Sequence, residues 1–236
     1  MPRYDILLLD ADGTLFDFER AEREALFAAL RARGIVPGER HLAAYREINE
    51  GLWRRFERGE LQKEELLRLR FSLYFEEMGI GEEPRRFNEE YLDELKKGAF
   101  LLPGAQELCE RLHGCCRLCL ATNGVSWVQR GRLRRSSIAP FIHDLFVSED
   151  LGAQKPQAAY FDRVFARLGR PPRERVIILG DSLTSDMRGG VDYGIATCWL
   201  NFGRHRAPGL PVTYQIHAIE EFVPIVLDAK SQEKFA

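Results

Sequence analysis

Short apolar segments rich in aliphatic and β-branched residues recur along the chain, and each runs into a polar or glycine-containing loop. They are residues 4–10 (YDILLLD), 117–123 (RLCLATN), 143–149 (HDLFVSE), 175–181 (RVIILGD) and 196–201 (ATCWLN). Their apolar residues are continuous rather than alternating, which is typical of strands buried on both faces of a sheet. The pattern therefore predicts strands in the interior of a mainly parallel sheet.

Helical periodicity lies between these segments. Residues 158–169 (AAYFDRVFARLG) carry apolar side chains at i, i+3, i+4 and i+7 and end in a glycine. Residues 103–114 (PGAQELCERLHG) likewise begin with a proline and end with a glycine. Alternation of strands and helices predicts an α/β fold with a doubly wound, mainly parallel, Rossmann-like sheet.

One long segment interrupts this alternation. From about residue 19 to 97 the sequence is charged and helical, as in residues 18–34 (FERAEREALFAALRARG), with almost no β-rich segments. An insertion of roughly eighty residues is large enough to have a small core of its own. We therefore expect a helical domain over residues 17–98, inserted into a core formed by residues 1–16 and 99–236.

Composition narrows the class of protein. The 236 residues carry 34 Lys and Arg against 36 Asp and Glu, a formal net charge of -2. This balance disfavours a nucleic-acid polymer as partner, because such binders have basic surfaces. No apolar run approaches the roughly 20 residues that a membrane span needs, and the N-terminal segment lacks the features of a signal peptide. We therefore expect no membrane partner and a cytoplasmic location.

The five cysteines form an odd set in which two are adjacent, which is a poor basis for a disulfide framework. Cys116 and Cys119 form a C-x-x-C pair, but it lies within a strand-like apolar segment, where an odd separation turns the two side chains to opposite faces. We interpret them as buried thiols, with a metal or redox site as the alternative.

Residues able to do chemistry gather where the predicted strands end. In an open parallel sheet, ligands bind beyond the carboxyl ends of the strands. Four strand ends together carry carboxylates, a hydroxyl, an amide and an ammonium group: Asp10, Asp12, Thr122, Asn123, Lys155, Asp181 and Asp186. Oxygen donors without histidine or cysteine favour Mg²⁺ as the cofactor. A hydroxyl and a lysine opposite such a metal suit a phosphoryl group.

The segment Asp10-Ala11-Asp12 has a specific interpretation. Alternate side chains of an extended chain share a face, so both carboxylates can project toward one site. If Asp10 is the ionised nucleophile and a metal ligand, Asp12 can hold a proton for the leaving oxygen, since different environments give two acids different roles. Gly13 allows a sharp turn and leaves backbone N–H groups free for phosphate oxygens.

These residues resemble the four motifs of the haloacid dehalogenase (HAD) superfamily. The matching segments, in the same order, are residues 10–16 (DADGTLF), 121–124 (ATNG), Lys155-Pro156 and residues 180–190 (GDSLTSDMRGG). The helical insertion resembles the helical cap of that superfamily. The resemblance implies that Asp10 forms an aspartyl-phosphate and that Asp12 is first the general acid and then the general base for water.

The same resemblance implies the remaining roles. Asp10, the backbone carbonyl of Asp12 and Asp181 would hold Mg²⁺, with Asp186 as a further ligand or as a partner of the ligands. Gly13, Thr122, Asn123 and Lys155 would bind the phosphoryl group, and Lys155 would also steady the nucleophile. From the residues alone, Asp186 could instead cap a helix.

A narrower resemblance concerns the substrate. Residues 48–71 (INEGLWRRFERGELQKEELLRLRF) and 189–201 (GGVDYGIATCWLN) are similar to the bacterial pyrimidine 5′-nucleotidase branch. The implied function is a Mg²⁺-dependent phosphomonoester hydrolase, a 5′-nucleotidase acting on pyrimidine nucleoside monophosphates. The alternatives are a phosphatase for another small metabolite, such as a sugar phosphate or phosphoglycolate, a haloacid dehalogenase, a phosphomutase, or a non-catalytic binding module.

Other features have structural interpretations. We expect Trp53 and Phe56 to lie in the core of the helical domain rather than against substrate, and the arginines of residues 129–137 (QRGRLRRSS) to form a solvated helix face. We expect the binding partner to be a small-molecule phosphomonoester. The sequence is compatible with either a monomer or a homodimer as the oligomeric state.

Overall fold

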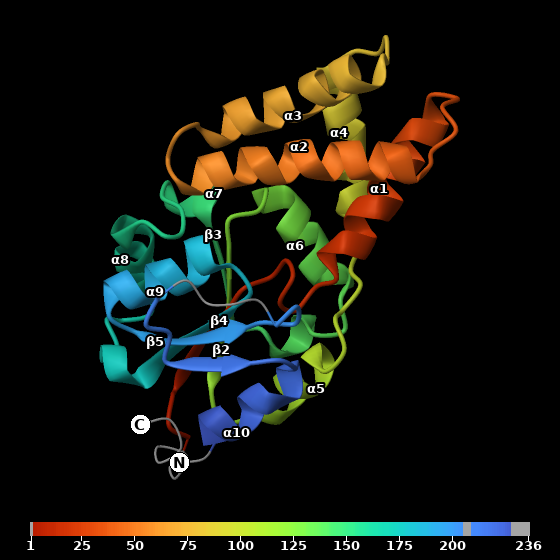
Figure 1. Cartoon of the computed structure of the whole chain (residues 1–236). Coiled ribbons are helices and arrows are strands. Elements are labelled where there is room, and N and C mark those ends of the chain that lie inside the picture. The colour runs from red at the N-terminus through yellow and green to blue at the C-terminus, as the bar shows by residue number, and fades with distance from the viewer. Residues whose placement is uncertain (1, 205–208, 228–236) are drawn as a thin grey trace. The chain divides into compact units, whose positions relative to one another are not determined.

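The computed structural model describes residues 2–204 and 209–227, and the chain divides into two compact units (Figure 1). The core unit consists of Met1–Asp17 and Phe100–Ala236, and the helical unit consists of Phe18–Ala99. The chain therefore leaves the core unit once, soon after its first strand, and returns to it once.

The core unit is built on a six-stranded sheet in which all neighbouring strands are parallel. Its strands are β1 (Ile6–Leu9), β2 (Arg117–Thr122), β3 (Asp144–Val147), β4 (Val176–Gly180), β5 (Ala196–Leu200) and β6 (Tyr214–Ile216). The spatial order β3-β2-β1-β4-β5-β6 is that of a doubly wound dinucleotide-binding sheet. The predicted fold class is confirmed. The hydrophobic pattern does not predict β6, a three-residue edge strand with an exposed Gln215 and no apolar run.

The strands are buried on both faces, as their continuous apolar sequences predict. On one face, Ile6 and Leu8 of β1 belong to a core cluster that includes apolar side chains of α8 (Ala158–Arg167) and Tyr193 of α9 (Arg188–Tyr193). Leu7 and Leu9 point to the other face and are also fully buried. Both faces of β1 are therefore covered, and its carboxyl end opens into the region where ligands bind in such sheets.

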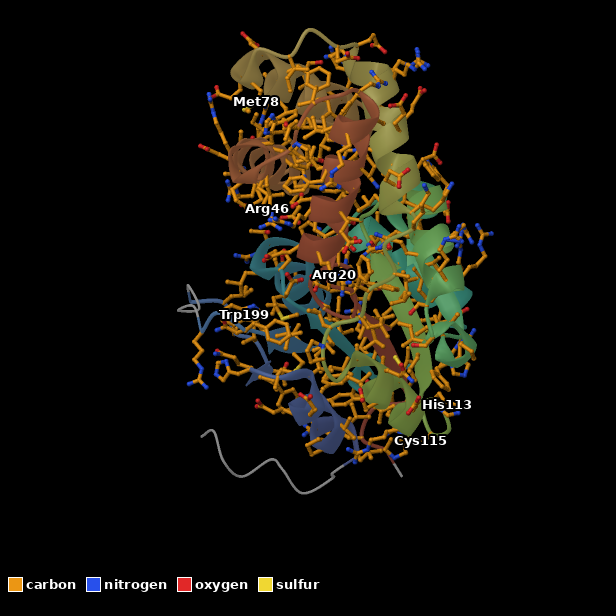
Figure 2. All side chains as sticks on the ribbon, turned by 90° about the vertical axis from the view of Figure 1, so that its right-hand side faces the viewer. Arg20, Arg46, Met78, His113, Cys115 and Trp199 are labelled. Carbon is orange, nitrogen blue, oxygen red and sulfur yellow. The ribbon has the colours of Figure 1, made fainter. Side chains whose placement is uncertain are left out.

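The core unit contains further helices. They are α5 (Ala105–Leu112), α6 (Ser126–Arg135), α7 (Ser148–Leu151) and α10 (Phe222–Leu227), with the short turns η1 (Ala139–Phe141), η2 (Arg173–Arg175), η3 (Leu183–Met187) and η4 (Ile219–Glu221). The five cysteines are all free, and four are buried. The exposed Cys115 lies near His113, just after α5 (Figure 2). The expectation of buried thiols is confirmed for Cys116 and Cys119 and is wrong for Cys115.

The two connections between the units run side by side within the core unit. The N–H of Asp17 donates to the carbonyl of Phe100 over 3.0 Å, and the N–H of Leu102 donates to the carbonyl of Leu15 over 2.9 Å. Phe16 and Leu101 form an isolated antiparallel bridge between these bonds. The chain thus enters and leaves the helical unit through one paired segment.

The helical unit consists of α1 (Phe18–Ala32), α2 (Glu39–Glu57), α3 (Lys63–Met78) and α4 (Pro84–Leu95). Its core is aromatic: Phe71 stacks on Tyr45 with ring centroids 5.0 Å apart and meets Phe87 edge to face at 4.8 Å. Phe56 is buried in a second cluster, where Trp53 packs against its ring. Both rings thus pack within the unit. Among the described residues, no helix combines the length and the apolar character that crossing a membrane would require.

The aromatic core of the helical unit generates a stability prediction. Phe71→Ala removes a fully buried ring from α3 and leaves a cavity among Tyr45, Phe87 and Tyr91. We expect a loss of about 3–5 kcal/mol in the free energy of unfolding, measured by urea denaturation followed by circular dichroism. The control is Leu73→Ala on the same helix, where the side chain is 38% exposed and the change should stay within about 0.5 kcal/mol. Equal losses in the two variants would contradict this packing.

Candidate active site

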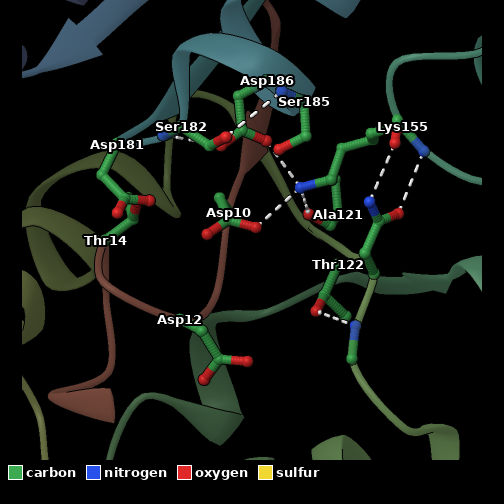
Figure 3. Close-up of polar contacts among 12 residues, drawn as sticks. Asp10, Asp12, Thr14, Ala121, Thr122, Lys155, Asp181, Ser182, Ser185 and Asp186 are labelled. Atoms are coloured by element: carbon green, nitrogen blue, oxygen red, sulfur yellow. Dashed lines mark hydrogen bonds and ion pairs between the residues drawn. The ribbon is translucent and has the colours of Figure 1, made fainter. Parts of the chain in front are cut away.

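Three carboxylates meet beyond the carboxyl ends of β1 and β4 (Figure 3). Asp10 directly follows β1, Asp181 directly follows β4, and Asp186 lies in the π-helical turn η3. One oxygen from each lies within 4.8 Å of the others. The position follows from the topology, because β1 and β4 are neighbours and the N–H of Asp10 donates to the carbonyl of Leu179 in β4 over 2.9 Å. The structure thus brings these three predicted site residues together.

The ammonium group of Lys155 is buried among these carboxylates, with 1% of the side chain exposed. Its Nζ lies 2.6 Å from Oδ1 of Asp10, 2.6 Å from Oδ1 of Asp186 and 2.5 Å from the carbonyl oxygen of Ala121. Asn123 holds the backbone of Lys155 in place: its amide donates to the Lys155 carbonyl over 2.9 Å, and its Oδ1 accepts from the Lys155 N–H over 3.0 Å. The Asn123 side chain therefore positions Lys155 here, and a direct contact of Asn123 with phosphate stays a prediction.

The pKa values of Asp10, Asp181 and Lys155 are shifted by desolvation and by the closeness of these charged groups to one another. Burial and the like charge of Asp186 raise the pKa of Asp10, against the opposing effect of Lys155. Desolvation and Asp186 raise the pKa of Asp181 to about 7, although Asp181 is exposed to solvent, which screens part of the effect. Burial alone would lower the pKa of Lys155, but Asp10 and Asp186 outweigh it and raise the pKa. Lys155 is therefore charged, and it leaves an excess of negative charge in the group.

The residues present fit a divalent cation. The donors are carboxylate oxygens, and the excess negative charge is what such a cation would neutralise. Two glycines keep the space around the donors open. A Cβ at Gly13, where φ is +81°, would lie 2.5 Å from Oδ2 of Asp181, and a Cβ at Gly180 would collide with the carboxylate of Asp186. Thr14 donates to Asp181 over 3.3 Å and so orients this carboxylate.

Two expectations about the surrounding residues need correction or refinement. The N–H of Gly13 is not free for phosphate, because it donates to the carbonyl of Phe16 over 3.0 Å. Asp186 is not simply a helix cap, because the side chain that caps η3 belongs to Ser182. Asp186 is 1% exposed and faces Lys155.

Thr122 is buried at the end of β2, the strand beside β1. Its hydroxyl accepts a hydrogen bond from the N–H of Gly124 over 2.9 Å, which leaves the hydroxyl proton available as a donor. The edge of the sheet therefore presents a hydroxyl donor near an ammonium group and a carboxylate, as the motifs predict.

The side chain of Asp12 points away from Asp10 and from the three-carboxylate group (Figure 3). It forms an ion pair with Arg132 and accepts a hydrogen bond from Nε2 of Gln129 over 2.5 Å. The sequence pattern predicts neither of these contacts. The expectation of a solvated arginine face is wrong at Arg132, whose side chain is 0% exposed. Gln129 and Arg132 lie three residues apart on one face of a helix, but this spacing alone does not predict burial of the arginine.

The family of the chain is shown by a match to a known family. The model of the haloacid dehalogenase-like hydrolase family matches residues 4–194. The chain belongs to this family. The match covers the segments that carry Asp10, Thr122, Lys155, Asp181 and Asp186.

Individual relatives agree with the family. The chain is 40% identical to YfnB of Bacillus subtilis, a protein named as an HAD hydrolase, over 96% of this chain and 97% of the relative. The crystal structure of YfnB superposes with a TM-score of 0.89 over 94% of this chain and 98% of that chain.

Two further relatives carry the name pyrimidine 5′-nucleotidase. PynA of Streptococcus pneumoniae is 34% identical over 84% of each chain. YjjG of Escherichia coli is 30% identical over 93% of this chain and 96% of the relative.

The three carboxylates generate a binding prediction for this HAD-like hydrolase. Binding to the native state alone raises stability by mass action, by about 2.7 kcal/mol at a ligand concentration a hundredfold above Kd. We therefore expect millimolar Mg²⁺ to raise the melting temperature of the protein. Asp181→Asn should remove most of this rise without lowering stability in the absence of Mg²⁺, because it relieves repulsion.

The matched control is Asp192→Asn. Asp192 is an exposed carboxylate on α9 that pairs with Arg188, and its loss should leave the Mg²⁺ response intact. An equal Mg²⁺ response in the wild type and in Asp181→Asn would contradict the site.

Proposed function

We propose that this HAD-like hydrolase is a Mg²⁺-dependent phosphomonoesterase that acts through an aspartyl-phosphate on Asp10, with pyrimidine nucleoside monophosphates as its substrates. One observation carries the proposal. The carboxylate of Asp10 contacts the buried ammonium group of Lys155 and lies within 4.8 Å of two further carboxylates, at the carboxyl end of an interior strand. This is a nucleophile held in one orientation beside groups that can hold a cation and a phosphoryl group.

The first step transfers the phosphoryl group to the protein. An oxygen of Asp10 attacks phosphorus, the bond from phosphorus to the leaving oxygen breaks, and the leaving oxygen takes a proton from Asp12. The hydroxyl of Thr122 donates to a phosphoryl oxygen, and Lys155 fixes the attacking carboxylate and offsets the charge on the transferred group. The products of this step are the dephosphorylated alcohol and the phosphorylated Asp10.

The second step returns the protein to its starting state. Asp12, now a carboxylate, takes a proton from a water molecule, and that water attacks phosphorus. The bond between phosphorus and the Asp10 oxygen breaks, which releases inorganic phosphate and restores both carboxyl groups.

Asp10, Asp181 and Asp186 are the side chains that would hold Mg²⁺, together with the backbone carbonyl of Asp12. When bound, Mg²⁺ supplies positive charge that lets a carboxylate approach a phosphate dianion. Magnesium has support from a relative, since the crystal structure of YfnB is that of the protein bound to magnesium.

The acidic group also bears on the main alternative within the family. A haloacid dehalogenase uses an aspartate nucleophile but needs neither a metal nor a second acid. In this chain Asp181 and Asp186 add two carboxylates beside Asp10 and raise its pKa, a costly arrangement unless a cation is to be bound. The residues therefore support phosphoryl transfer over dehalogenation.

The substrate class rests on the relatives named pyrimidine 5′-nucleotidases and on the similarity of residues 48–71 and 189–201 to that branch. The core residues bind groups that every phosphomonoester shares. We therefore propose that the helical unit acts as a cap and discriminates between leaving groups. The crystal structure of YfnB reveals interdomain movement in that protein, which is consistent with a mobile cap.

The nucleophile is tested by Asp10→Asn. The substitution keeps the shape of the side chain and removes the attacking charge, so kcat for a pyrimidine nucleoside monophosphate should fall by several orders of magnitude while circular dichroism stays unchanged. Asp192→Asn is the control and should retain wild-type kcat. Residual turnover within about tenfold of wild type would refute attack by Asp10.

The substrate class is tested by a phosphate-release assay with Mg²⁺ over a panel of phosphomonoesters. We expect pyrimidine deoxynucleoside monophosphates to show higher kcat/KM than hexose phosphates or phosphoglycolate. A sugar phosphate or phosphoglycolate that exceeds the nucleotides by tenfold, which is about 1.4 kcal/mol in transition-state stabilisation, would overturn the nucleotidase assignment and leave the phosphatase assignment standing.

A further inference from the structure

The carboxylate of Asp12 is held in a definite place outside the three-carboxylate group. Asp12 is two residues from Asp10, and its side chain is turned away from that residue (Figure 3). Its Oδ1 pairs with a guanidinium nitrogen of Arg132, and its Oδ2 accepts from Nε2 of Gln129 over 2.5 Å. Both oxygens therefore have a donor from α6, and the side chain is fixed at two points.

The donors are more deeply buried than the group they hold. The side chain of Arg132 is 0% exposed, whereas that of Asp12 is 26% exposed. The guanidinium carbon of Arg132 also lies 4.7 Å from the centroid of the Phe16 ring, an aromatic contact that fixes it from a second side. Burying an arginine is costly unless it is paired. The ion pair between the buried guanidinium of Arg132 and the carboxylate of Asp12 offsets this cost.

The segment between Thr122 and α6 is adapted to the same contact. A Cβ at Gly124 would collide with the side-chain amide of Gln129, so the glycine lets Gln129 reach Asp12. Gln129 is itself buried, with 4% of its surface exposed. Two buried side chains and one glycine thus converge on a single partly exposed carboxylate.

We propose that Arg132 and Gln129 are positioning residues for Asp12. They hold its carboxylate apart from Asp10, Asp181 and Asp186, so that it stays available to the leaving oxygen instead of joining the metal ligands. This inference rests on the proposed function, in which Asp12 exchanges a proton with the leaving group. Each carboxyl group of the Asp-x-Asp segment then has its own basic partner: Lys155 for Asp10, and Arg132 for Asp12.

The test compares Arg132→Met with its conservative variant Arg132→Lys, in the presence of Mg²⁺. Misplacement of a catalytic group by about 1 Å costs on the order of a hundredfold in rate. We expect Arg132→Met to lower kcat for a nucleoside monophosphate by about 10–100-fold, with KM changed by less than about threefold. The loss should be smaller for p-nitrophenyl phosphate, whose leaving group needs little protonation, and Arg132→Lys should restore part of the rate.

A double-mutant cycle separates positioning from a purely structural role. In an Asp12→Asn background, Arg132→Met should cause no further loss in kcat, because Arg132 acts through the Asp12 carboxylate. Arg135→Met, at an exposed arginine on the same helix, is the matched control and should retain wild-type kinetics. If Arg132→Met does not fold, Gln129→Met carries the same comparison, since it keeps the length of the side chain and removes the donor.

The outcomes are distinguishable. An equal loss for both leaving groups, an additive loss in the Asp12→Asn background, or an unchanged or raised kcat in Arg132→Met and Gln129→Met would overturn the positioning role while the wild type stays active. A wild type that releases phosphate from none of the phosphomonoesters would instead overturn the proposed function, and this inference with it.

Discussion

The buried ammonium group of Lys155 is the interaction on which the site depends. It contacts two carboxylates, those of Asp10 and Asp186, which come from different segments of the core unit and would otherwise repel each other in a desolvated place. Its backbone is fixed in turn by both polar ends of the Asn123 side chain. Residues that follow three different strands thereby contact Lys155. These contacts fix the orientation of the Asp10 carboxylate.

The same constraint explains features that are not themselves reactive. One ammonium group leaves the cluster negative, and desolvation together with the like charge of Asp186 raises the pKa of Asp181. Small residues stand where side chains would crowd the carboxylates, at Gly13 beside Asp181 and at Gly180 beside Asp186. The arrangement is therefore suited to a divalent cation more than to a self-contained ion pair.

The fold and most of the site could be predicted from the sequence, for a physical reason. Strands buried on both faces give long apolar runs, and parallel strands place their carboxyl ends at one edge, so Asp10, Asp181 and Lys155 had to be near one another. The contacts of Arg132 could not be predicted in this way, because an arginine in a charged helix is ordinarily solvated and its burial depends on tertiary packing. The short strand β6 lacks an apolar run, and the N–H of Gly13 donates within a local turn. Neither feature changes the hydrophobic pattern of the sequence, so neither could be predicted from that pattern.

The central claim is that Asp10 becomes phosphorylated. The most direct measurement uses Asp12→Asn with p-nitrophenyl phosphate and Mg²⁺, because this leaving group departs with little help while the loss of the general base slows hydrolysis of the intermediate. The reaction is quenched in acid within the first turnover and the protein is analysed by mass spectrometry with fragmentation. We predict one added phosphoryl group, located on Asp10 and absent when Asp10→Asn is also introduced. Release of nitrophenol in step with inorganic phosphate, with no phosphoryl group on the protein or with one on another residue, would contradict it.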